Sequence, residues 1–194
     1  METGAQRRDL ILEAAIAVFG RSGFKKTSVD DLAAAAGISK QGLYLHFPSK
    51  ESVFVAALQK YLDDCLGSVQ QELATPNRSL LDRMTRAMDA WFGRHLATFT
   101  PESFDVIEAS KLLALDRLKE YESALQAKLT KALADSADFN RAKNVCAPRE
   151  VTGVLLRCGS TWRHCHLSRA EFMKQMKVCI RACCQLESLR ESGK

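Results

Sequence analysis

Apolar residues recur at the three- and four-residue spacing of an α-helix along almost the whole chain of 194 residues. The first such stretch covers residues 7–21, and two glycines, Gly20 and Gly23, follow it as a stop signal. Helix-favouring residues such as Ala, Leu, Lys and Glu dominate the composition, and strand formers are sparse. The sequence therefore predicts an all-α fold of about nine helices.

A pair of short helices separated by a glycine turn stands out over about residues 28–47. Thr27 and Asp30 have the spacing of a capping box at the start of the first helix, and Gly37 is placed to end it. Ser39 is placed to cap the second helix. Two short helices joined in this way form a helix–turn–helix, whose second helix enters the major groove of DNA.

The second helix carries side chains suited to such a groove. Lys40 can donate to guanine, and Gln41 can form a bidentate pair with adenine. Tyr44 is expected on the same outer face. Hydroxyl groups and cations near helix ends can hold phosphates, and five residues have such positions: Thr27, Ser28, Ser39, His46 and Lys50.

The stretch AVFGRSGFKKTSVDDLAAAAGISKQGLYLHFPSKESVF resembles the DNA-binding domain of the TetR family of transcriptional regulators, and LYLHFPSKE is its most specific part. The resemblance covers about residues 6–60. It implies an all-α homodimer that binds a palindromic operator, usually as a repressor, and that a small inducer bound in the C-terminal domain releases from DNA. Lys50 matches a lysine that often reaches a phosphate in this family.

The resemblance also implies roles for the second helix. Tyr44 and His46 match positions that usually contact the DNA backbone, while Lys40 and Gln41 match variable positions that read bases. Leu45 stands where the family often has a polar or aromatic residue. Its apolar side chain predicts either packing within the protein or contact with a thymine methyl group.

Two domains follow from this organisation. We expect a three-helix DNA-binding domain over residues 1–50, joined by a connecting helix over residues 49–73. Residues 51–194 are expected to form the ligand-binding and dimerisation domain. Its further helices are predicted at about 78–96, 102–112, 117–135, 148–166 and 169–189.

The last two predicted helices, over residues 148–166 and 169–189, both carry an apolar stripe. The stripes consist of Val151, Val154, Leu155, Cys158, Trp162 and Cys165, and of Phe172, Met176, Cys179, Ile180 and Cys183. A lone subunit would have difficulty covering both, so these helices are predicted to form the homodimer interface.

Six of the seven cysteines lie after residue 145, and the sequence leaves their role open. They can act as small apolar groups inside the helices. Alternatively they predict a redox sensor, or a zinc or copper site formed by Cys158, His164, Cys165 and His166. In a reducing compartment they are expected to remain thiols.

Aromatic residues gather around residues 91–104 and predict either an effector cavity or plain core. The residues expected to line such a cavity are Trp91, Phe92, Phe99, Phe104 and Trp162. No cofactor is predicted besides an unidentified small-molecule effector.

Other classes of function find no support in the sequence. No apolar run approaches the roughly 18 residues of a membrane span, and the N-terminus lacks the apolar region of a signal peptide, so a cytoplasmic protein is expected. The chain has no nucleophile elbow, phosphate-binding loop or zinc-protease motif, which argues against an enzyme. The net charge of +5 is only weakly typical of proteins with polyanionic partners.

Overall fold

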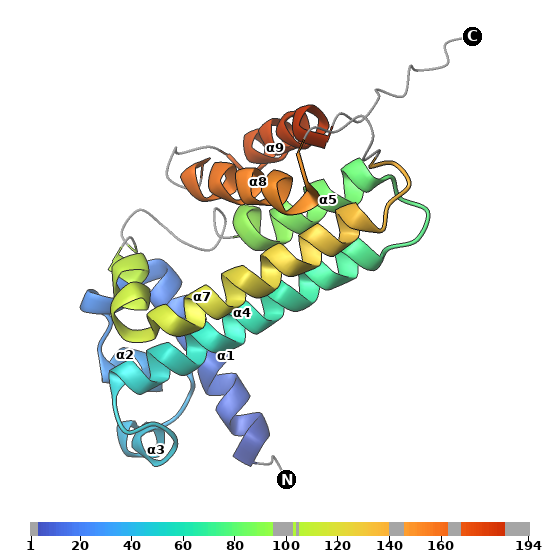
Figure 1. The fold of residues 1–194 in the computed structure, drawn as a ribbon. Coiled ribbons are helices and arrows are strands. Elements are labelled where there is room, and N and C mark those ends of the chain that lie inside the picture. Colours follow the sequence, from blue (N-terminus) through green and yellow to red (C-terminus); the bar gives the residue numbers. More distant parts are fainter. Residues whose placement is uncertain (1–3, 95–102, 104, 140–145, 163–167, 185–194) are drawn as a thin grey trace. The chain divides into compact units, whose positions relative to one another are not determined.

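The computed structural model describes residues 4–94, 103, 105–139, 146–162 and 168–184. Over these residues the regular elements are eight α-helices and one π-helical turn, which confirms the predicted all-α fold (Figure 1). The chain forms two compact units, one from residues 1–65 and 97–121 and the other from residues 66–96 and 122–194.

The N-terminal unit is built on α1 (Gly4–Lys26), α2 (Val29–Ala35) and α3 (Lys40–His46). The first parts of α4 (Lys50–Ala74) and α7 (Asp105–Ala134) complete it. The three predicted N-terminal helices and the connecting helix are therefore confirmed, with ends that move by a few residues.

The end of α1 shows what the two glycines do. Gly20 stays inside the helix, where it is buried, and does not end it. The helix is interrupted at Gly23, which has a φ of 80° that only glycine adopts without strain. One further turn leads to Lys26 and brings the chain to the start of α2.

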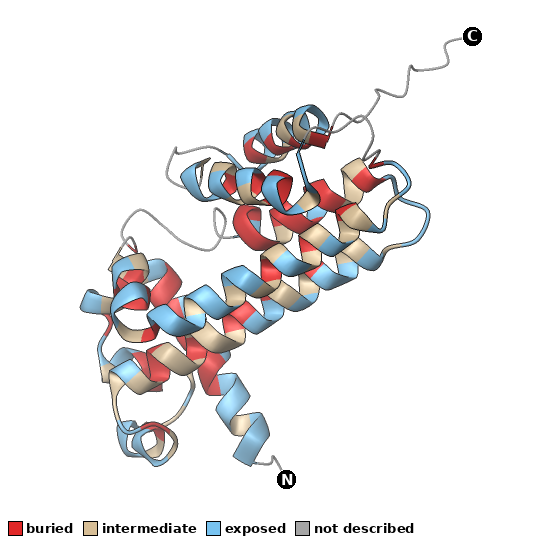
Figure 2. Ribbon diagram, viewed as in Figure 1, coloured by how far each residue is buried: buried red, intermediate tan, exposed pale blue. Residues whose placement is uncertain are grey.

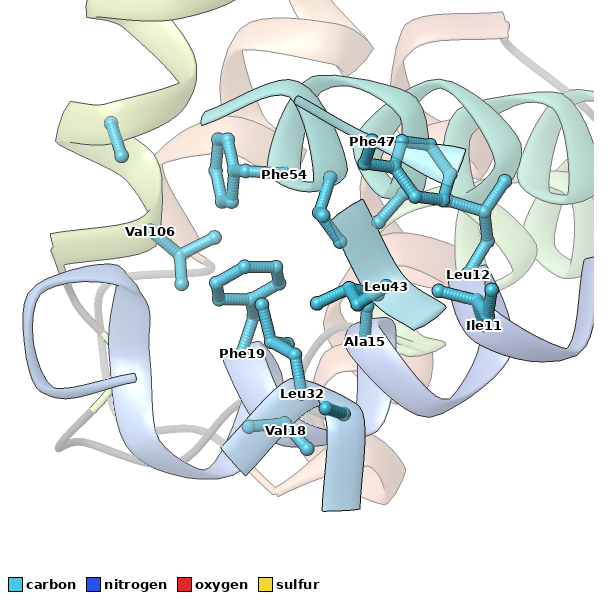
Figure 3. Close-up of a cluster of buried hydrophobic side chains, with 14 residues drawn as sticks. Ile11, Leu12, Ala15, Val18, Phe19, Leu32, Leu43, Phe47, Phe54 and Val106 are labelled. Atoms are coloured by element: carbon cyan, nitrogen blue, oxygen red, sulfur yellow. The ribbon is translucent and has the colours of Figure 1, made fainter. Parts of the chain in front are cut away.

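The core of the N-terminal unit joins all of its helices (Figure 3). The rings of Phe19 in α1 and Phe54 in α4 meet edge to face with centroids 5.1 Å apart. Leu32 in α2 and Leu43 in α3 are each 1% exposed, so both short helices are anchored by a leucine. Val106 of α7 belongs to the same cluster.

The start of α7 is bound to the end of α1. The carboxylate of Asp105 accepts the backbone N–H groups of Phe24, at 2.9 Å, and of Lys25, at 2.6 Å. The two helices predicted at 102–112 and 117–135 are joined in α7, and the predicted break between them is present as a kink. The backbone leaves the helical conformation at Ala114 (φ −147°, ψ 30°), although no glycine or proline lies between the two predicted segments.

The C-terminal unit contains α5 (Leu80–Met88), α8 (Pro148–Trp162) and α9 (Arg169–Cys184), with the remaining parts of α4 and α7. The helix predicted at 78–96 is α5 followed by η1, a π-helical turn over Asp89–Gly93. Each predicted helix thus corresponds, over its described residues, to helical structure.

Half of the ten described stripe residues on α8 and α9 are buried within one chain (Figure 2). Leu155, Phe172, Met176 and Ile180 are each 0% exposed. A lone subunit therefore covers more of these stripes than expected, because the two helices pack on each other and α9 packs on α5. Cys165 lies outside the described residues.

None of the described helices combines the length and the apolar character that a bilayer crossing requires.

Candidate nucleic-acid interface

The first helix of the helix–turn–helix begins at Val29 and is capped by Ser28, one residue after the predicted cap. The Ser28 hydroxyl accepts the backbone N–H of Asp31 at 3.1 Å, and the Asp31 carboxylate accepts the N–H of Ser28 at 2.8 Å. The hydrogen bond from the Ser28 N–H, and then a second one from the Ser28 hydroxyl at 2.7 Å, lower the pKa of the Asp31 carboxyl. The capping box predicted for Thr27 and Asp30 is wrong, because Thr27 is buried and donates its hydroxyl to the carbonyl of Gly23 at 2.6 Å.

The turn and the start of α3 follow the prediction. Gly37 has a φ of 64°, the left-handed conformation that ends α2 and redirects the chain. The hydroxyl of Ser39 accepts the backbone N–H of Gly42 at 3.0 Å and caps α3. The orientation of α3 is thus fixed by the Ser39 cap just before the helix and by Leu43 in the core.

The outer face of α3 is exposed and of mixed chemistry (Figure 2). Lys40 and Gln41 are exposed, Tyr44 is 47% exposed and Leu45 is 83% exposed. The exposure of Leu45 removes one of its two predicted roles, which was packing within the protein. All four side chains are accessible to a partner.

Lys40 is paired with a residue that the sequence did not single out. Its ammonium nitrogen lies 2.9 Å from a carboxylate oxygen of Asp30 in α2. This hydrogen bond, together with the negative charge, raises the pKa of Lys40, so the lysine stays protonated. The pair holds the lysine side chain against α2.

The end of α3 is held by Arg8 of α1. The guanidinium of Arg8 lies 4.2 Å from the centroid of the Phe47 ring, and its Nη1 donates to the carbonyl of His46 at 3.3 Å. His46, a predicted backbone contact, is half-buried. Only the tertiary fold reveals this contact, because 38 residues separate Arg8 from His46.

Lys50 is also engaged within the N-terminal unit. Its ammonium donates to the carbonyls of Phe24 and Thr27, each at 3.0 Å, and lies 4.4 Å from the centroid of the Phe24 ring. It thereby ties the start of α4 to the segment between α1 and α2. Two of the three donors of this ammonium are used inside the protein.

The predicted effector residues lie in a different unit and pack closely. Trp91 and Phe92 are buried on η1, and Trp162 is half-buried on α8. The rings of Phe92 and Trp162 each lie 6.3 Å from the ring of Phe172. Phe99 and Phe104 lie outside the described residues. A small apolar cavity of about 30 Å³ lies elsewhere, in the N-terminal unit, between Phe19, Phe54, Tyr61 and Val106 among others.

A salt bridge joins η1 to α9. The guanidinium of Arg169 donates to both carboxylate oxygens of Asp89, at 2.9 Å and 2.6 Å. Asp89 is 9% exposed, and both of its carboxylate oxygens accept from this guanidinium. The hydrogen bonds to Asp89 raise the pKa of Arg169.

Three cysteines meet between α8 and α9. The sulfur of Cys179 lies 3.9 Å from that of Cys158 and 4.0 Å from that of Cys183. Burial, and then the neighbouring thiols, raise the pKa of Cys179 to about 12, which opposes formation of a thiolate. This arrangement does not favour a redox sensor.

The predicted metal site is largely beyond the described residues. His164, Cys165 and His166 lie outside them, and Cys158 is half-buried on α8. Within the described parts of the chain, no group of three or more His, Cys, Asp or Glu side chains is arranged to hold a metal ion.

Known proteins resemble the chain most strongly in the N-terminal region. Residues 11–57 match the family model described as bacterial regulatory proteins, tetR family. The transcriptional activator FasR of Mycolicibacterium smegmatis is 38% identical over 89 residues, which are 45% of this chain and 39% of FasR. The transcriptional repressor KstR2 of the same organism is 37% identical over 95 residues, which are 49% of this chain and 42% of KstR2. The chain thus aligns with less than half the length of these relatives.

Solved structures resemble the chain over most of its length. A tetR-family transcriptional regulator from Streptomyces coelicolor superposes with a TM-score of 0.71 at 21% identity, covering 93% of this chain and 81% of that one. The TetR-family regulator PfmR from Thermus thermophilus gives a TM-score of 0.67 at 22% identity, covering 88% of this chain and 97% of PfmR. At this identity the likeness concerns the fold.

Proposed function

Because its N-terminal domain makes this chain a member of the TetR family of bacterial regulatory proteins, we propose that it is a transcriptional regulator that binds duplex DNA through α3. The observation that carries the proposal is the exposed face of α3, on which Gln41 and Tyr44 stand over the buried Leu43. A helix anchored on one side and polar on the other is a rigid support for reading base edges.

The dimensions of α3 suit the major groove. An α-helix with its side chains is about 10–12 Å across, and the groove is about 12 Å wide. Gln41 is proposed to read adenine, and Lys40 to reach a guanine or a phosphate once it leaves Asp30. We leave Thr27 out of the proposed contacts because its side chain is buried.

Backbone contacts are proposed at the edges of this surface. The hydroxyls of Ser39 and Tyr44 lie on exposed residues and can donate to phosphate oxygens. The Ser28 hydroxyl is also exposed but donates to the Asp31 carboxylate at 2.7 Å, so it reaches a phosphate only after leaving Asp31. His46 is half-buried, so phosphate contact uses the part of its side chain that remains accessible. Lys50 is also half-buried and its ammonium donates to two carbonyls, so we propose that it supports this surface without contacting a phosphate directly.

A homodimer is proposed to form through α8 and α9. Although half of their described stripe residues are buried, Val154 on α8 is 40% exposed and Val178 on α9 is 59% exposed. A two-fold assembly would present two α3 helices to a palindromic operator, about 34–36 Å apart or a multiple of this spacing. Val178→Asp is expected to give monomers in analytical ultracentrifugation, and Leu112→Asp on α7 is its control.

We further propose that the regulator represses and that a small molecule controls it. Occupying a promoter is enough to exclude polymerase, whereas activation needs an additional surface that contacts polymerase. The effector is proposed to bind the C-terminal unit near Trp91 and Trp162, which are the only two tryptophans of the chain. Intrinsic tryptophan fluorescence therefore reports on binding at this location.

DNA binding is tested by fluorescence anisotropy with the full chain and duplexes from the region flanking its own gene. Gln41→Ala and Tyr44→Ala are each expected to weaken binding at least tenfold, because each variant loses a proposed contact with the DNA. Gln71→Ala, an exposed glutamine on α4, is the matched control and should not change affinity. Equal affinity of all three variants would overturn the proposal.

A further inference from the structure

Leu45 is the most exposed large hydrophobic residue on the outer face of α3. Its side chain is 83% exposed, whereas Leu43, two residues earlier, is 1% exposed. Tyr44 and Leu45 follow Gln41 by three and four residues, so both side chains lie next to Gln41 on one face of the helix. A single exposed leucine is ordinary on a protein surface, and its significance here comes from its place on the proposed reading face.

The charged member of this face is already engaged. Lys40 pairs with Asp30 at 2.9 Å, which leaves an amide, a phenol and an isobutyl group facing outward. An amide forms a bidentate pair with adenine, and an apolar side chain is complementary to the thymine methyl group, the one apolar group in the major groove. The outward-facing side chains of α3, other than Lys40, therefore complement the groups that A·T base pairs present in the major groove.

On this basis, and resting on the proposed function, we infer that Leu45 contacts the 5-methyl group of a thymine in each half-site and is a specificity-determining residue. Leu45 lies four residues after Gln41, which is about 6 Å along the helix axis. Base pairs of B-DNA are about 3.4 Å apart. The thymine read by Leu45 thus lies within about two base pairs of the adenine read by Gln41.

The test removes the methyl group alone. A duplex is first selected from a random library with the full-length protein, and each thymine is then replaced by deoxyuridine, one position at a time. Loss of one buried methyl contact is expected to weaken binding about fourfold at one position in each half-site. The other thymines should tolerate the replacement.

The variant Leu45→Ala shows which side chain reads that methyl group. It should bind the selected duplex more weakly than the wild type and should no longer distinguish thymine from uracil at the sensitive position. Leu112→Ala is the matched control, because Leu112 is also 83% exposed but lies on α7. This control should keep the wild-type affinity and the wild-type response to uracil.

The outcomes separate this inference from the proposed function. If a duplex is selected and no thymine is sensitive, or if Leu45→Ala keeps the sensitivity to uracil, the inference is overturned while DNA binding stands. If no duplex is selected at all, the proposed function fails and the inference fails with it. Thermal melts of both variants, which should match the wild type, establish that they fold.

Discussion

The ammonium of Lys40, the first residue of α3, donates to the carboxylate of Asp30 in α2 at 2.9 Å. A predicted DNA-reading cation is thus bound to an acidic residue ten positions earlier in the same helix–turn–helix. DNA phosphates and Asp30 compete for one ammonium group. The carboxylate also places a negative charge close to the proposed polyanionic ligand.

Asp30→Asn is therefore expected to strengthen DNA binding several-fold at low salt, because it frees Lys40 and removes a repulsive charge. The measurement is anisotropy over a salt series. Asp135→Asn is the matched control, because it removes the partner of Lys131 in another exposed ion pair. That pair lies at the end of α7, with the two charged groups 2.8 Å apart. Weaker binding by Asp30→Asn than by this control would show that the pair positions Lys40 for DNA instead.

Lys50→Met is expected to lower the free energy of unfolding by about 2 kcal/mol, because two hydrogen bonds from a charged donor are lost. Urea unfolding measures this loss. Lys26→Met, at the exposed end of α1, should cost less than about 0.5 kcal/mol. An equal loss in both variants would contradict the role of Lys50 in joining α4 to Phe24 and Thr27.

The same variant has a second readout in DNA binding. A lysine that contacts a phosphate contributes about one unit to the slope of log K against log salt. Because two donors of Lys50 are used internally, we expect its loss to change affinity with little change of slope. A slope reduced by about one would show that Lys50 contacts phosphate directly.

Gly93→Ala is expected to destabilise the C-terminal unit by about 2 kcal/mol or more. A Cβ at Gly93 would clash with Oδ1 of Asp89, so the carboxylate would have to leave Arg169. Gly67→Ala on α4 is the matched control. Its Cβ meets nothing within 4 Å, and the helix should gain about 0.8 kcal/mol.

Arg169→Ala in the Gly93→Ala background distinguishes this mechanism from simple overpacking. If Gly93→Ala acts by displacing Asp89 from Arg169, the two changes share one interaction and their costs do not add. Fully additive losses in urea unfolding would show that Gly93→Ala acts elsewhere.

Alkylation of the thiols is expected to depend on position and pH. At pH 8 the thiolate fraction of Cys179, whose pKa is about 12, is about a thousandfold lower than that of a thiol with the ordinary pKa of 9.0. Cys146 is exposed and should react first with iodoacetamide. The Cys179 rate should rise tenfold per pH unit up to the limit of stability, as mass spectrometry of peptides would show. Rapid labelling of Cys179 at pH 8 would contradict this order.

Hydrogen bonds between residues close together in the sequence were predictable, whereas contacts between distant residues were not. Ser39 was identified as the cap of α3 because the cap and its partner Gly42 are three residues apart. For α2, Thr27 and Ser28 both have an aspartate three residues later, and only the burial of Thr27 selects Ser28. A pattern read along the chain cannot decide between two equivalent caps.

The proposed reading face was predicted by composition and spacing, but its electrostatic neighbours were not. Lys40, Gln41 and Tyr44 are exposed where helical periodicity puts them. The hydrogen bonds that Lys50 and Arg8 donate join residues that are 23 to 38 positions apart in the sequence. Such pairs have no signature in one sequence, because they exist only once the helices have packed.

The contacts of Asp105 and Val106 limit where the chain can be shortened without loss of stability. Both belong to the N-terminal unit, although about 40 residues separate them from its other members. A fragment ending at residue 65, which would contain the whole family match, would lack the acceptor for the N–H groups of Phe24 and Lys25 and would open its core to water. Truncation would therefore produce a weakened DNA-binding module, and its low affinity would be mistaken for a property of the native regulator.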